Sequence, residues 1–199
     1  MTKSTDFLFD FGSPAAYLAW TQLPQLAAAT GATVNALPIL LGGVFQATGN
    51  RAPISVPLKG SYLFKDLDRF ARRYGVPLVM NPHFPINTIT LMRIDVGMLQ
   101  AGHPQLLAYR DAVFRAIWAE QRNMGDADTV AEVLTAAGLD GPALLALAAD
   151  PQVKESLKVR TQQAVDRGVF GAPTFFVGDE MFWGQDRLDF VRAALTATP

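Results

Sequence analysis

A serine followed by a proline, at the end of the first apolar segment, is the residue of this chain best placed to do chemistry. Residues 7–17 read FLFDFGSPAAY, a predicted strand that leads through Ser13 and Pro14 into a predicted helix. The first N–H groups of a helix lack partners within it, and the helix dipole is positive at that end. A thiolate or carboxylate beside Ser13 would therefore be stabilised. The simpler interpretation is that Ser13 is only the N-cap, with Pro14 at the first helical position, where its missing N–H costs nothing.

Composition excludes several classes of function. The 199 residues are 50% hydrophobic, which is enough for a sizeable core in one domain that holds a large insertion. The formal net charge is −1 and no basic cluster occurs, so we expect no binding to nucleic acid and no binding to a membrane surface. We expect a cytoplasmic protein, because no segment has the length of a signal peptide's hydrophobic region or of a membrane span.

The chain has no cysteine, which excludes disulfides, thiolate metal sites and redox chemistry carried by its own thiols. Its two histidines, His83 and His103, belong to no spaced set of ligands, so no metal site is expected. A hydrolase built on Ser13 is a poor candidate. The sequence GSPAAY lacks the G-x-S-x-G elbow, and neither histidine has an obvious matching role.

The order of the predicted elements indicates a mixed α/β fold. Residues 14–29 form a predicted helix that ends before Gly31, and ATVNALPIL is a predicted second strand. Residues 42–61 are rich in glycine, proline and small polar residues and are predicted to be a loop, suited to form a lid or a pocket wall. A helical middle follows, with an amphipathic helix from Tyr62 to Tyr74. The last fifty residues read as a helix ending at Gly168, two strands joined by a Gly-Asp turn, and a final helix.

This order is that of a thioredoxin-like fold with a large all-helical insertion. We expect residues 1–41 and 152–199 to form the thioredoxin-like domain and residues 42–151 the helical insertion domain. In thioredoxin-like proteins the loop before the third strand carries a cis-proline that faces the active-site helix. Pro173, within GAPTFFV, holds this place, so the peptide before it is predicted to be cis; seen alone, it would equally well be a residue of strand entry.

Three motifs in order, GSPAAY, GAPTFFV and FWGQDRL, resemble the 2-hydroxychromene-2-carboxylate isomerase family, which is related to kappa-class glutathione transferases and to DsbA-type oxidoreductases. The segments LLGGVFQATGN, YLFKDLDRFARRYGVP and NPHFPINT are also similar to the family's pattern, so the resemblance covers essentially the whole chain. In DsbA-type proteins a nucleophilic cysteine occupies the position of Ser13. With serine at this position the redox activity of the cysteine is lost, but the anion site at the helix N-terminus is kept. Family members commonly carry a lysine within the VFQATGN stretch, where this chain has Gln46.

The resemblance implies that glutathione is the cofactor and that Ser13 is the catalytic residue, which donates a hydrogen bond to the sulfur. Ala172 and Pro173 would bind the cysteinyl main chain of glutathione. Asp186 would bind the α-ammonium of the γ-glutamyl group and would also be an ordinary N-cap of the last helix. The residues implied for the γ-glutamyl site are Trp183, Gly184, Gln185 and Asp186.

Substrate contacts are implied for Phe45, Asn50 and Phe84, while Lys59 would attract a carboxylate or, as loop lysines often do, remain solvated. The implied activity is a glutathione-dependent isomerase of aromatic catabolism: the thiolate adds to a conjugated carbon, the ring opens, a bond rotates and the thiolate leaves.

Two alternatives stay open, a kappa-like glutathione transferase that conjugates an apolar electrophile and a redox-silent thioredoxin-like binding protein. The partners implied are a small aromatic substrate, glutathione and a second copy of the chain in a homodimer.

Overall fold

The computed structural model describes residues 3–197 and has the predicted α/β arrangement, a thioredoxin-like fold with inserted helices. The division into domains at residues 41 and 152 stays a prediction. In chain order the elements are β1 (Ser4–Phe9), α1 (Pro14–Thr30), β2 (Thr33–Pro38), α2 (Leu41–Thr48), the 3-10 turn η1 (Pro53–Ser55), α3 (Pro57–Tyr74), α4 (Ile89–Gln100), α5 (Leu106–Trp118), α6 (Ala127–Ala136), α7 (Gly141–Leu147), α8 (Pro151–Asp166), β3 (Thr174–Val177), β4 (Glu180–Trp183), the 3-10 turn η2 (Gln185–Arg187) and α9 (Leu188–Thr196).

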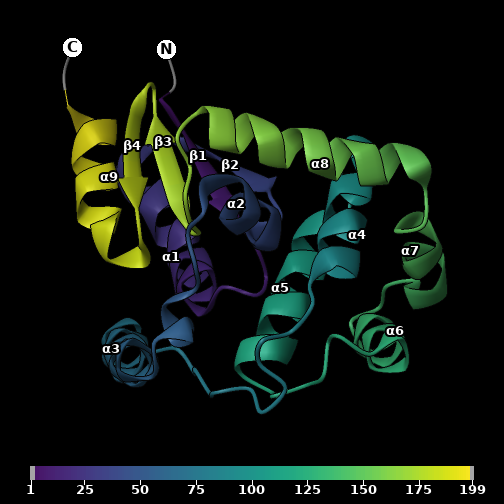
Figure 1. Cartoon of the computed structure of the whole chain (residues 1–199). Coiled ribbons are helices and arrows are strands. Elements are labelled where there is room, and N and C mark those ends of the chain that lie inside the picture. The colour runs from purple at the N-terminus through teal and green to yellow at the C-terminus, as the bar shows by residue number, and fades with distance from the viewer. Residues whose placement is uncertain (1–2, 198–199) are drawn as a thin grey trace.

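The strands form one mixed sheet in the order β2-β1-β3-β4. β1 pairs in parallel with β2 and antiparallel with β3, and β3 pairs antiparallel with β4 (Figure 1). In this register Leu8 lies opposite Thr174, so the end of β1 and the beginning of β3 lie side by side. The pairing therefore brings the turn that carries Ser13 next to the loop that carries Pro173.

Alternating side chains of β1 point into two separate hydrophobic cores, as the period of two along a strand requires. Phe7 and Phe9 belong to the core shared with α1, α9 and the inserted helices. Leu8 belongs to the core on the other face, with Val44 of α2 and Ala164 of α8. Figure 1 shows α8 running from the sheet to α7, past α4. The sheet is thus covered on both faces, and α8 links it to the inserted helices.

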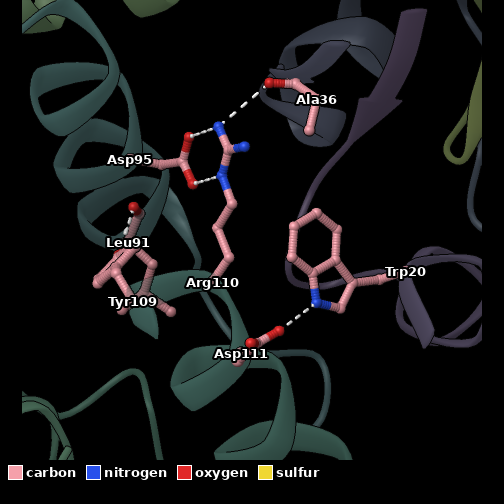
Figure 2. Close-up of polar contacts among 7 residues, drawn as sticks. All are labelled: Trp20, Ala36, Leu91, Asp95, Tyr109, Arg110 and Asp111. Carbon is pink, nitrogen blue, oxygen red and sulfur yellow. Dashed lines mark hydrogen bonds and ion pairs between the residues drawn. The ribbon is translucent and has the colours of Figure 1, made fainter. Parts of the chain in front are cut away.

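A buried ion pair ties the inserted helices to the sheet (Figure 2). The carboxylate of Asp95 in α4 accepts two hydrogen bonds of 2.8 Å from the guanidinium of Arg110 in α5. The same guanidinium donates to the carbonyl of Ala36 in β2 at 3.1 Å. Beside it, the indole N–H of Trp20 in α1 donates to Asp111 at 2.7 Å. These bonds fix where α4 and α5 lie against β2 and α1.

The prediction of a loop over residues 42–61 was wrong, because α2 occupies its first part and α3 begins earlier than expected. The cause lies in remote residues. The N–H groups of Leu40 and Leu41 at the start of α2 donate to the Thr161 hydroxyl and the Asp10 carboxylate, so a glycine-rich segment becomes a helix through acceptors that its own sequence lacks. Within residues 3–197 no helix is long and apolar enough to cross a bilayer.

Removing one charge of the buried pair should destabilise the protein strongly. In Asp95→Leu the Arg110 guanidinium stays buried without its counter-charge, so we expect the free energy of unfolding in urea to fall by about 3–5 kcal/mol. The double variant Asp95→Leu/Arg110→Met removes both charges and should recover most of that loss. Asp68→Asn, which breaks an exposed pair with Arg72, should cost under about 1 kcal/mol. Equal losses in the single and double variants would contradict this account.

Candidate active site

A cavity of about 420 Å³ is lined by segments that are distant in the sequence. They are the turn between β1 and α1, α2 with the residues after it, α3, the turn between α3 and α4 that holds Phe84, the loop before β3, and the chain from the end of β4 through η2. The fold brings all the site residues expected from the sequence to this one cavity. Their individual roles stay predictions. Those residues are Ser13, Phe45, Asn50, Lys59, Phe84, Ala172, Pro173, Trp183, Gly184, Gln185 and Asp186.

Ser13 is hydrogen-bonded on two sides at the N-terminus of α1. Its Oγ accepts a hydrogen bond from the N–H of Ala16 at 3.1 Å, which makes it the N-cap of the helix. The same hydroxyl donates to the main-chain oxygen of Ala172 at 2.9 Å. Ser13 is therefore a cap, and its only proton also joins the start of α1 to the loop before β3.

The backbone N–H groups of Ala15 and Ala172, both residues of the cavity wall, have no hydrogen-bond partner within residues 3–197. Pro14 has no N–H, so Ala15 provides the unpaired donor of the first turn of α1. Because the helix dipole is positive there, these donors suit an anion, and the Ala172 N–H also suits the main chain of an extended peptide.

The loop before β3 is fixed by close contacts. The Ala172–Pro173 peptide is cis, which confirms the prediction. The carbonyl of Pro173 accepts a hydrogen bond of 3.0 Å from the N–H of Gly184, at the end of β4. Gly171 lies against Trp183, because a Cβ at residue 171 would be 2.6 Å from the indole Nε1. Glycine at this position therefore lets the half-exposed Trp183 ring stand at the cavity wall.

The prediction that Asp186 caps the last helix was wrong. Gly184, with φ of 108°, turns the chain into η2, so Asp186 lies inside that turn and α9 begins at Leu188 without a side-chain cap. The Asp186 carboxylate instead accepts a hydrogen bond of 2.6 Å from the guanidinium of Arg187. A carboxylate and a guanidinium thus stand together at the cavity wall, which complements the two charges of an amino-acid zwitterion.

The remainder of the cavity is largely apolar and also contains the cations Arg51 and Lys59 and one carboxylate, that of Asp66, which pairs with Arg69. Its larger apolar side chains include Phe45, Ile54, Leu63, Phe64, Leu67 and Phe84. The Asn50 amide is already engaged: its nitrogen donates to the carbonyl of Phe170 at 2.8 Å, and its oxygen accepts from the N–H of Arg51 at 2.8 Å. Gln46, in the VFQATGN stretch, lines a separate cleft between α2, α4 and α8.

The sequence did not identify Ala15, Arg51 and Arg187 as site residues. Arg51 and Arg187 each follow directly after an expected site residue, and this adjacency was the available signal. Ala15 contributes its backbone N–H, which its residue type does not reveal.

Comparison with known proteins agrees with this fold. Residues 5–196 match the family model of the DSBA-like thioredoxin domain, so the class is thioredoxin-like. A 2-hydroxychromene-2-carboxylate isomerase of Sphingobium xenophagum is 36% identical, over 98% of this chain and 99% of its own. The solved structure of a 2-hydroxychromene-2-carboxylate isomerase superposes with a TM-score of 0.82 at 36% identity, covering 96% of this chain and 94% of that one. Glutathione S-transferase kappa 1 of Caenorhabditis elegans is 26% identical over 94% and 88% of the two chains. The chain belongs to the 2-hydroxychromene-2-carboxylate isomerase family within the DSBA-like thioredoxin domains.

Removing the Ser13 hydroxyl should cost modest stability. We expect Ser13→Ala to lower the free energy of unfolding in urea by about 0.5–2 kcal/mol, because the Ala16 N–H loses its cap acceptor. The circular dichroism spectrum should be unchanged. Thr21→Ala is the matched control, since it removes a hydroxyl from the interior of α1 that caps no helix end. This hydroxyl donates to the carbonyl of Leu18 and accepts from the side-chain amide of the neighbouring Gln22, and its loss should have a smaller effect. A Ser13→Ala protein as stable as wild type would show that the cap contributes nothing.

Proposed function

We propose that this protein is a glutathione-dependent isomerase of the 2-hydroxychromene-2-carboxylate isomerase type, with glutathione as a cofactor that is not consumed. One observation carries the proposal. The Ser13 hydroxyl and the unpaired N–H groups of Ala15 and Ala172 converge on a cavity whose remaining wall is mostly apolar. Donors for an anion beside an apolar space suit a thiolate and an aromatic substrate.

The residues at the wall fit the three parts of glutathione. The Ala172 N–H, in the loop that leads into β3, can pair with the cysteinyl main chain as in strand addition. Asp186 and Arg187 offer a carboxylate for the γ-glutamyl ammonium and a guanidinium for its carboxylate. Ser13 and Ala15 supply donors to the sulfur at the N-terminus of α1.

Bound glutathione supplies a thiolate, a nucleophile that adds to a conjugated carbon and leaves again. The chain's own task is to keep the sulfur ionised, because a free thiol titrates near ~8.5 and a helix N-terminus lowers that value. The Ser13 hydroxyl has one proton, now donated to the Ala172 carbonyl. To donate to sulfur, it turns from that carbonyl while its oxygen still accepts from Ala16. The Ala172 carbonyl is then available to the main-chain N–H of the tripeptide.

Arg51 and Lys59 provide positive charge for the carboxylate of the second substrate, and the phenyl rings of the cavity wall pack against its aromatic ring. Arg51 has no ion-pair partner within residues 3–197, so its guanidinium can bind a carboxylate without first breaking a salt bridge. A lysine in place of Gln46 is not required, since residue 46 lines the cleft on the other side of α2.

A kappa-like glutathione transferase is the second candidate, favoured by the apolar lining of the cavity. The isomerase regenerates free glutathione, whereas the transferase releases the glutathione adduct. Mass spectrometry of the products formed from 2-hydroxychromene-2-carboxylate and from a neutral electrophile distinguishes the two. The homodimer and the cytoplasmic location stay predictions.

Titration calorimetry with reduced glutathione tests the cofactor. We expect the wild-type protein to bind it, and ultraviolet thiolate absorbance should show that the bound thiol titrates below ~8.5. In Ser13→Ala this titration should move back toward the free value and turnover should fall strongly. S-methylglutathione, which has no ionisable thiol, is the matched ligand control. A folded wild-type protein that does not bind glutathione would refute the proposal.

Arg51→Gln should weaken recognition of the substrate carboxylate. A hydrogen bond to a charged group contributes about 1.5–3 kcal/mol, so KM for the carboxylate substrate should rise by roughly 10- to 150-fold. Glutathione affinity and turnover of a neutral electrophile should stay unchanged. Arg72→Gln, on the exposed face of α3, is the control and should leave all three quantities as in wild type. An unchanged KM would remove Arg51 from the substrate site.

A further inference from the structure

Asp10 lies outside the cavity lining but touches three of the segments that build it. The residue follows β1 directly and is 2% exposed. Its Oδ1 accepts hydrogen bonds from the N–H of Gly12 at 2.8 Å and from the hydroxyl of Thr88 at 2.6 Å. Its Oδ2 accepts from the N–H of Leu41 at 2.8 Å. Within residues 3–197 no cation pairs with this carboxylate, so three neutral donors alone compensate its burial.

Each donor belongs to a different part of the site. Gly12 precedes Ser13, whose own N–H donates to the Asp10 carbonyl at 3.0 Å. Leu41 begins α2, a helix whose own N-cap makes no side-chain hydrogen bond, so the remote Asp10 provides the cap from the end of β1. Thr88 immediately precedes α4 and ends the turn that contributes Phe84 to the cavity lining.

We propose that Asp10 is a positioning residue whose carboxylate holds the Ser13 turn, the start of α2 and the entry to α4 in one fixed arrangement. It touches neither glutathione nor substrate in this assignment. The inference rests on the proposed glutathione-dependent function. It assigns to Asp10 the role of setting the distance between the glutathione side and the substrate side of the cavity.

A carboxylate is required because two backbone N–H groups bind its two different oxygens. Asparagine has one acceptor oxygen, so in either orientation of its amide the N–H of Gly12 or of Leu41 faces an NH₂ group and loses its acceptor. Protonation of Asp10 weakens the same bonds. Burial raises the pKa of Asp10, and the hydrogen bonds from Thr88, Gly12 and Leu41 oppose that rise.

Asp10→Asn tests the inference. Asp6→Asn is the matched control, because Asp6 lies on the preceding strand β1 and its carboxylate forms a partly exposed ion pair with Arg167. In Asp10→Asn we expect faster amide hydrogen exchange over residues 39–48 and a drop of at least roughly tenfold in kcat/KM, the scale of one lost hydrogen bond to a charged group. Asp6→Asn should change neither quantity. Exchange is measured without glutathione, so it tests positioning even if the wild-type protein proves not to bind glutathione.

Thr88→Val is a milder second variant, which keeps both backbone donors and removes one hydroxyl. Because the Thr88 bond lowers the pKa of Asp10, its loss should move the acidic limb of the kcat/KM profile to higher pH. In the double variant Thr88→Val/Asp10→Asn this shift of the acidic limb should be absent. If the Thr88 bond had a merely structural role, Thr88→Val would lower stability and leave the acidic limb in place. Unchanged exchange in a folded Asp10→Asn protein, or an unmoved acidic limb in Thr88→Val, would overturn the inference.

Discussion

Backbone N–H groups at the starts of helices must find acceptors, and at the cavity the start of α2 takes its acceptors from remote segments. Ser13 caps α1 locally, but its own proton reaches the loop before β3. The start of α2 depends on the Asp10 carboxylate and on the Thr161 hydroxyl of α8. Because each bond joins elements that are far apart in the chain, the walls of the cavity cannot shift independently. The same bonds that satisfy the helix ends therefore assemble the site.

The inserted helices reach this arrangement through the buried Asp95–Arg110 pair. Arg110 bonds to the carbonyl of Ala36 and lies 5.3 Å from the ring of Phe9, so its charge is anchored at the sheet and covered by an aromatic side chain. Such a buried ion pair contributes little net stability, but its hydrogen-bond geometry allows few alternative positions of α4 and α5. It fixes α4 against β2, and the first turn of α4 follows Thr88, which reaches Asp10. The position of the inserted helices therefore determines where Thr88 meets Asp10 beside the cavity.

Local signals predicted the parts of the site that depend on local structure. Ser13-Pro14 after an apolar strand and the loop before β3 both lie where capping and strand patterns placed them. α2 could not be predicted, because its glycines are typical of loops and its caps are distant residues. Asp186 failed as a cap because the turn at Gly184 depends on a backbone angle that the sequence does not show. Arg51 and Ala15 reach the site only through tertiary packing.

Under the proposed function, the serine also explains how the cavity stays ordered before glutathione binds. With the Ser13 proton on the Ala172 carbonyl, one donor meant for sulfur and one acceptor meant for the peptide main chain satisfy each other. Binding then replaces one hydrogen bond by others rather than exposing a buried group, so little reorganisation opposes it. A chain without cysteine holds no thiol that could form a disulfide with the bound cofactor. The site thus contributes positioning and electrostatic stabilisation. The nucleophilic sulfur, which must add and leave in every cycle, belongs to bound glutathione and not to a cysteine of the protein.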